Sequence, residues 1–86
     1  MPTISNFYGI MIRKHWNEHG PPHFHAWYAG DRVGLAITDL RILDGGLPPR
    51  ALAMVRKWAL MHRAELIEDW ELCRAKIRPR PIEPLA

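Results

Sequence analysis

The sequence contains a single cysteine and no long apolar run, and both features restrict where the protein works. Cys73 cannot form a disulfide bond within the chain, so we expect a reducing environment and a buried, apolar role for this thiol. The apolar run from Phe7 to Ile12 covers six residues. The core of a signal peptide needs roughly 7–15 apolar residues and a membrane-spanning helix about 20. The sequence therefore predicts a cytoplasmic protein without a membrane segment.

The chain also lacks internal repeats and any linker long enough to separate two domains. Its 86 residues therefore predict a single domain, residues 1–86, with one modest core. Apolar residues make up 48% and charged residues 24% of the chain, which is typical of soluble globular proteins. The formal net charge of +3 favours an acidic partner or nucleic acid, although so small an excess is weak evidence for either.

The first half of the chain has the composition and the two-residue period of a β-sheet. Strands are predicted at residues 7–16, 23–29, 32–38 and 41–43. Gly30 and Asp31 would form a tight hairpin turn between the second and third strands, and Asp39 with Leu40 would lead into the short fourth strand. We expect an antiparallel sheet of three to four strands over about residues 7–43, which "DGG" then ends.

After Pro48 the period changes to that of a helix. The apolar stripe consists of Leu52, Val55, Ala59, His62, Leu66, Trp70 and Cys73. It predicts one long helix over about residues 49–75, roughly 40 Å at about 1.5 Å per residue. A bend or break near His62, or a partner that covers its end, would accommodate that length. The basic side chains at its start, Arg50, Arg56, Lys57 and Arg63, are expected on its solvated surface. The whole pattern predicts an α+β fold with an extended, proline-rich tail, in which Ile82 and Leu85 can dock on the core.

Alternation along the strands separates the side chains into two sets. The set expected against the helix comprises Ile10, Ile12, Phe24, Tyr28, Val33, Leu35 and Ile37. The opposite face would carry Arg13, His15, His23, His25 and Trp27 above small residues. His62 lies in the helical stripe and would meet His23 and His25 only if they faced the helix instead. We prefer the first arrangement because it buries more apolar side chains.

The histidines around the motif "PPHFHAW" allow three interpretations. Two imidazoles can act as base and acid in metal-independent RNA cleavage, with His19, His23 and His25 as the candidate catalytic residues. Arg13 or Lys14 would then bind the phosphate, and Trp16 and Trp27 would stack on bases. The same three histidines, or Glu18 in place of His19, are candidate ligands for a divalent metal such as zinc, although no closed metal-binding template is matched. Otherwise the histidines pack and hydrogen-bond to the backbone of the loop.

Several longer stretches carry a family resemblance. "MPTISNFYGIMI", "HGPPHFHAWYAG", "LDGGLPPRAL" and "VRKWALMHRAEL" closely resemble a family of small bacterial proteins, the domain of unknown function number 4160. The chain departs from the family pattern at Leu40, where a glycine is usual after the second turn. The resemblance implies a setting like that of toxin–antitoxin modules, with a second small, antitoxin-like protein as partner. It carries over no catalytic residue, so a ribonuclease-like toxin and a non-catalytic module that binds a partner or nucleic acid both remain open. Self-association of the chain is the other way in which its surface would be covered.

Overall fold

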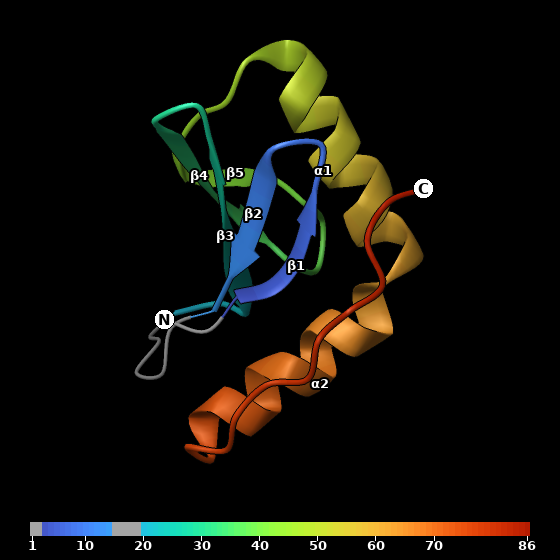
Figure 1. Cartoon of the computed structure of the whole chain (residues 1–86). Helices are drawn as coiled ribbons and strands as arrows, with labels where there is room; N and C mark the ends of the chain where they lie inside the picture. Colours follow the sequence, from blue (N-terminus) through green and yellow to red (C-terminus); the bar gives the residue numbers. More distant parts are fainter. Residues whose placement is uncertain (1–2, 15–19) are drawn as a thin grey trace.

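The structure is a computed structural model that describes residues 3–14 and 20–86. Five antiparallel strands follow one another in the sheet in the order β1-β2-β3-β4-β5, and two helices lie to one side of it (Figure 1). The strands are β1 Thr3–Phe7, β2 Ile10–Arg13, β3 His23–Tyr28, β4 Asp31–Ala36 and β5 Ile42–Gly45, and the helices are α1 Pro49–Met61 and α2 Arg63–Arg74. The expected α+β class is confirmed.

The sheet has one strand more than the largest number predicted, because β1 lies before the first predicted strand, residues 7–16, and shares only Phe7 with it. The chain reverses at Tyr8 and Gly9, whose φ values are 50° and 79°, and Phe7 pairs with Ile10. The turn between β3 and β4 has the same form, with φ values of 49° at Ala29 and 87° at Gly30. The prediction of Gly30 and Asp31 as the turn residues is wrong by one residue, because Asp31 already pairs with Tyr28. Two central residues with positive φ match the right-handed twist of a two-residue hairpin. A tyrosine in this conformation is uncommon, so the sequence gives little sign of the first hairpin.

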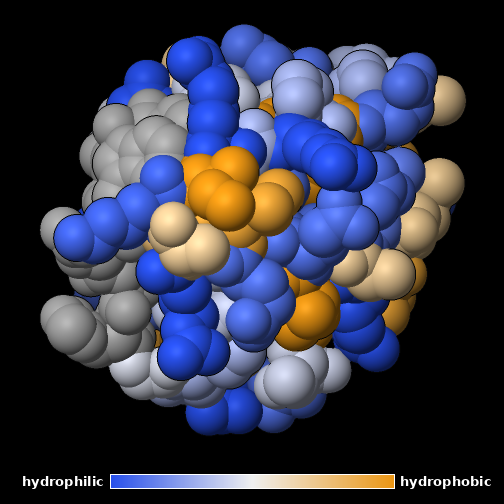
Figure 2. All heavy atoms as spheres, turned by 90° about the horizontal axis from the view of Figure 1, so that it is seen from below, coloured by the Kyte–Doolittle hydropathy of each residue, from blue (hydrophilic) through white to orange (hydrophobic). Residues whose placement is uncertain are grey.

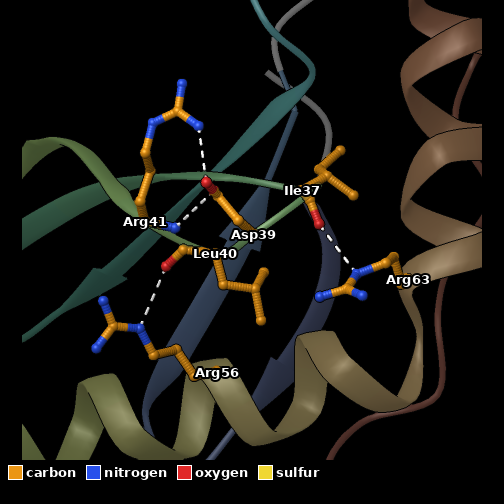
Figure 3. Close-up of polar contacts among 6 residues, drawn as sticks. All are labelled: Ile37, Asp39, Leu40, Arg41, Arg56 and Arg63. Carbon is orange, nitrogen blue, oxygen red and sulfur yellow. Dashed lines mark hydrogen bonds and ion pairs between the residues drawn. The ribbon is translucent and has the colours of Figure 1, made fainter.

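The predicted single long helix is two helices, because the helical backbone is interrupted at His62. No glycine or proline marks the interruption. The Nε of Arg63 donates to the carbonyl of Ile37 at 3.1 Å, which ties the start of α2 to the chain after β4 (Figure 3). In the part of the chain that the structure describes, neither helix is long and apolar enough to cross a bilayer.

The connection between β4 and β5 is held from both helices (Figure 3). Leu40 has a φ of 60° and is buried, and its carbonyl accepts a hydrogen bond from the Nε of Arg56 at 3.2 Å. Asp39 accepts from the backbone and the guanidinium of Arg41, and these two bonds lower the pKa of its carboxyl group. Arg56 and Arg63, which were expected on a solvated surface, therefore stabilise this turn. In it Leu40 takes the left-handed backbone conformation that glycine usually occupies.

The core lies between the sheet and the helices. Ile10, Ile12, Phe24, Ala26, Val33, Leu35 and Ile37 have no exposed surface, and Tyr28 packs at their border. The alternation therefore predicted the apolar face correctly. Cys73 is buried, as expected.

The proline-rich tail docks on the core, as predicted. Ile82 is buried and its N–H donates to the carbonyl of Ile4 at 2.7 Å, so the tail satisfies part of the outer edge of β1. The indole N–H of Trp58 donates to the carbonyl of Glu83 at 2.8 Å, and Leu85 packs against the core cluster. In Figure 1 this segment runs back along α2 and α1.

Candidate nucleic-acid interface

The face of the sheet opposite the core is built from charged and aromatic side chains, and we call it the polar face. Its members are Arg13 on β2, His23, His25 and Trp27 on β3, Arg32 on β4 and Asp44 on β5. Side chains two residues apart on a strand share a face, while the intervening Phe24 and Ala26 are fully buried on the other side. Because Arg13 pairs with His25, and Trp27 with Arg32, the register gathers these side chains on neighbouring strands.

Arg13 and Trp27 form a stacked pair on the polar face. The guanidinium carbon of Arg13 lies 5.3 Å from the centre of the Trp27 ring, and its Nε donates to the Sδ of Met11 at 2.9 Å. A cation over an indole face at this distance is held by the ring quadrupole. The pair presents a positive charge and a flat ring together, both of them half-buried.

His23 and His25 lie side by side, with ring centres 5.2 Å apart. The Nδ1 of His23 lies 2.8 Å from the carbonyl oxygen of Pro21. A carbonyl can only accept, so Nδ1 carries the proton, and the neutral ring has its lone pair on Nε2. "PPH" thus selects one tautomer of His23, which is the role that backbone carbonyls have beside catalytic and metal-binding histidines.

His25 is more deeply placed than His23, with 8% of its surface exposed. Its ring lies over Gly34 on the neighbouring strand: a Cβ at Gly34 would stand 3.1 Å from Cδ2 and 3.3 Å from Nε2 of this ring. Glycine at this position therefore leaves the room that the imidazole takes. The same added Cβ would lie 3.7 Å from the Cβ of Asp44, so His25 and Asp44 flank Gly34.

Arg32 and Asp44 form an ion pair beside Trp27. The guanidinium of Arg32 donates to Oδ2 of Asp44 at 2.7 Å, and both side chains are substantially exposed, by 44% and 60%. Sequence reasoning missed both residues. A two-residue turn fixes the register, and the observed turn at Ala29 and Gly30 sets Arg32 opposite Trp27. The turn predicted at Gly30 and Asp31 would instead have placed Gly34 there.

Lys14 is not brought to the polar face with Arg13. It shares the strand parity of Ile10 and Ile12, and its side chain is fully buried on the helix side. Its ammonium donates to the carbonyl of His23 and lies 4.2 Å from the ring centre of Trp70 on α2. The Trp70 ring also contacts the His23 ring, at 5.2 Å between centres. His23, the first residue of β3, therefore lies at the end of the polar face that borders α2, and Lys14 and Trp70 contact it from the helix side.

The remaining candidates lie elsewhere. His19 and Trp16, together with His15 and Glu18, fall outside the described residues. His62 lies at the junction of the helices, where its ring packs 5.6 Å from that of Trp58 and its Nδ1 donates to Glu65 at 2.6 Å. Among residues 3–14 and 20–86, no three His, Cys, Asp or Glu side chains gather as a metal site would require. His23 and His25 alone do not make a closed metal site.

Comparison with known proteins gives one family. The model of the family described as "Domain of unknown function (DUF4160)" matches residues 9–71. The chain belongs to this family. All six members of the polar face lie within the DUF4160 match, whereas β1 and the tail lie outside it. No curated protein and no solved structure matches the chain significantly.

Proposed function

We propose that this protein binds single-stranded RNA on the polar face of its sheet, as one component of a two-protein module of the toxin–antitoxin type. The observation that carries the proposal is the stacked pair of Arg13 and Trp27 beside His25. Proteins bind single-stranded nucleic acid through aromatic rings that stack on the bases and through cations that neutralise the phosphates. The polar face presents both, one strand apart.

Of the two faces of the sheet, the polar face is the one that suits a ligand. The core side of the sheet is occupied by apolar side chains and the helices, so it has no room for a ligand. The polar face carries two arginines and one carboxylate among its described members, which suits a polyanion. The formal charge of +3 on the whole chain acts in the same direction.

RNA cleavage is the second candidate function. Two observations favour it: the rings of His23 and His25 lie close together, and the hydrogen bond to Pro21 fixes the tautomer of His23. In this reaction Nε2 of His23 would accept the proton of the 2′-hydroxyl as the 2′-oxygen attacks phosphorus. The 5′-oxygen would leave with a proton donated by His25. Arg13 would neutralise the charge that develops on the phosphate. The depth of His25 counts against rapid exchange of its proton with solvent, so binding is the primary proposal.

A protein partner belongs to the same proposal. Apolar side chains remain exposed in the described part of the chain, and among them Leu60 and Met61 at the end of α1 each expose 62% and Ile77 exposes 53%. Figure 2 shows groups of apolar atoms open between hydrophilic side chains on the face that it views. An antitoxin-like protein or a second copy of the chain would cover such groups.

The binding proposal is tested with fluorescently labelled single-stranded RNA and fluorescence anisotropy. Replacing Trp27 with Ala should weaken binding by about 1–3 kcal/mol, since stacking on an aromatic ring contributes that much per base. Arg13→Gln should weaken binding of all sequences and reduce the slope of log K against log salt concentration by roughly one. Tyr8→Ala, which removes a 60% exposed aromatic ring at the β1–β2 turn, is the control and should leave binding unchanged. Equal binding by the wild type and Trp27→Ala would exclude the proposed surface.

The cleavage proposal is tested in the same samples with excess chelator. RNA cleavage that survives the chelator and is lost in His23→Ala would support the acid–base pair. Cleavage that stops on chelation, together with near one equivalent of metal by elemental analysis, would instead assign the histidines to a metal. Binding without cleavage would leave the protein as an RNA-binding module.

A further inference from the structure

We infer that the ion pair of Arg32 and Asp44 recognises guanine in the RNA strand that stacks on Trp27. The inference rests on the proposed function, because it assigns the base that the polar face selects. Arg32 lies directly opposite Trp27 in the β3–β4 register, and its guanidinium reaches across to Asp44 on β5. A base held at the indole therefore has the two charged groups on its β4 and β5 side.

The ion pair offers an ordered combination of donors and acceptors. Only Oδ2 of Asp44 is bonded to Arg32, and a carboxylate has about four lone-pair sites, so Asp44 keeps acceptor capacity. A guanidinium has five N–H donors in a planar fork, so Arg32 keeps donors after its bond to Asp44. The 2.7 Å contact orients both groups before any ligand arrives, which lowers the entropy cost of binding.

Guanine matches this combination better than the other bases. Its Watson–Crick edge presents two neighbouring donors, N1–H and the N2 amino group, beside the acceptor O6. A carboxylate can accept from both donors while a guanidinium donates to the acceptor. Adenine and cytosine offer the carboxylate a single amino group, and uracil a single ring N–H. Inosine keeps N1–H and O6 but lacks the amino group, so it isolates one of the bonds.

A second ion pair of the chain provides a matched control. Arg41 and Asp39 are in contact at 2.9 Å with side chains 55% and 54% exposed, but they lie on the β4–β5 connection, beside Leu40 (Figure 3). Asp44→Asn and Asp39→Asn each remove one exposed carboxylate from an ion pair and change the net charge equally. They differ in their distance along the sheet from Trp27.

The experiment measures fluorescence anisotropy with oligoadenylate that carries G, inosine or A at one central position. The wild type should prefer the G strand over the A strand by at least about fivefold, since a bidentate base contact is worth about 1–3 kcal/mol. The inosine strand should bind with intermediate affinity. Asp44→Asn should abolish the preference, whereas Asp39→Asn should keep it, and circular dichroism should show both variants folded.

Two results would overturn the inference while the proposed function stands. If Asp44→Asn strengthens the binding of all three strands equally, Asp44 only repels phosphate and reads no base. If the wild type binds the three strands equally and Trp27→Ala weakens all of them, the RNA-binding face is retained and guanine recognition alone fails. Absence of RNA binding by the wild type would overturn the inference together with the proposed function.

Discussion

The two faces of one sheet differ sharply in how closely packing constrains them. On the apolar face, Ile12, Phe24 and Leu35 have no exposed surface and contact the helices or one another in a single core cluster. On the polar face, Arg32 and Asp44 are exposed and hold each other by an ion pair. Alternate residues of the same strands thus meet dense packing on one side and an ion-paired, partly solvated surface on the other.

The difference indicates which face is available for function. A side chain on the apolar face is fixed by the volume that it fills, so its identity is explained by stability. Stability does not explain Arg13 stacked on Trp27, since half-exposed contacts of this kind contribute about 0.5–1 kcal/mol each. Stability does not explain the packing of His25 over Gly34 either, because a glycine in the interior of a strand lowers the stability of the sheet. The polar face therefore carries the features that packing leaves unexplained.

The largest expected effect tests the contrast within a single strand. Phe24→Ala should lower the free energy of unfolding by about 3–5 kcal/mol, because it removes a fully buried ring and leaves a cavity. Trp27→Ala, three residues away on the polar face, should cost only about 1 kcal/mol. Urea unfolding followed by far-UV circular dichroism measures both. Equal losses would mean that the polar face is packed as tightly as the core and that the contrast is false.

A smaller expected effect on stability tests whether an exposed position always tolerates substitution. Gly45 belongs to the exposed strand β5, yet it has a φ of 69° and a Cβ there would overlap the carbonyl oxygen of Arg32. Gly45→Ala should therefore destabilise the protein by about 2–4 kcal/mol through the left-handed backbone and the clash. Gly46→Ala is the control, since a Cβ at Gly46 meets no atom within 4 Å. Its unfolding free energy should change by no more than about 0.5 kcal/mol, and a similar loss in both variants would contradict the steric explanation.

The same contrast explains how much the sequence predicted. The apolar face was predicted residue by residue because a two-residue period and burial act together. The first hairpin was missed because Tyr8 takes the left-handed conformation without the Asn-Gly or Asp-Gly pair that marks such turns. The break at His62 was only an alternative, since no helix-breaking residue lies there and tertiary contacts such as that of Arg63 with Ile37 set the direction of α2.

The candidate site was predicted in part for related reasons. Alternation places His23, His25 and Trp27 on one face, but the same rule applied to β2 places Lys14 inward, and that consequence was overlooked. Arg32 and Asp44 depend on the pairing of β3, β4 and β5, which single-strand patterns do not contain. The β4–β5 register also shifts between Gly34 and Leu35. Counting residues from the β4–β5 connection therefore does not predict that Asp44 pairs with Gly34.

The helix side also contains buried charged side chains, Lys14 and Asp69, and Asp69 allows the finest test. Asp69 on α2 is 1% exposed, its Oδ1 accepts the backbone N–H of Arg80 at 2.8 Å, and its Oδ2 has no hydrogen-bond partner in the described structure. Burial raises the pKa of this carboxyl group, the bond from Arg80 and the charge of Lys14 oppose that shift, and Glu68 and Glu65 add to it. The net direction is upward, so desolvation outweighs the attraction of Lys14.

The folded state holds the Asp69 proton more tightly than the unfolded state does, because the pKa of this carboxyl group is raised on folding. The stability that this proton contributes is therefore complete below pH 3.8, the ordinary pKa of the group. It is lost as the pH rises through the raised pKa. Asp69→Asn keeps an acceptor for Arg80 and does not titrate. The unfolding free energy of Asp69→Asn relative to the wild type should therefore increase between pH 4 and pH 7, as measured by urea unfolding at each pH. Glu68→Gln, which neutralises the exposed neighbour of Asp69, should show a much weaker trend. If Asp69→Asn instead loses stability relative to the wild type as pH rises, the attraction between Asp69 and Lys14 exceeds the cost of burial, and the helix side contains a stabilising charge pair within its apolar packing.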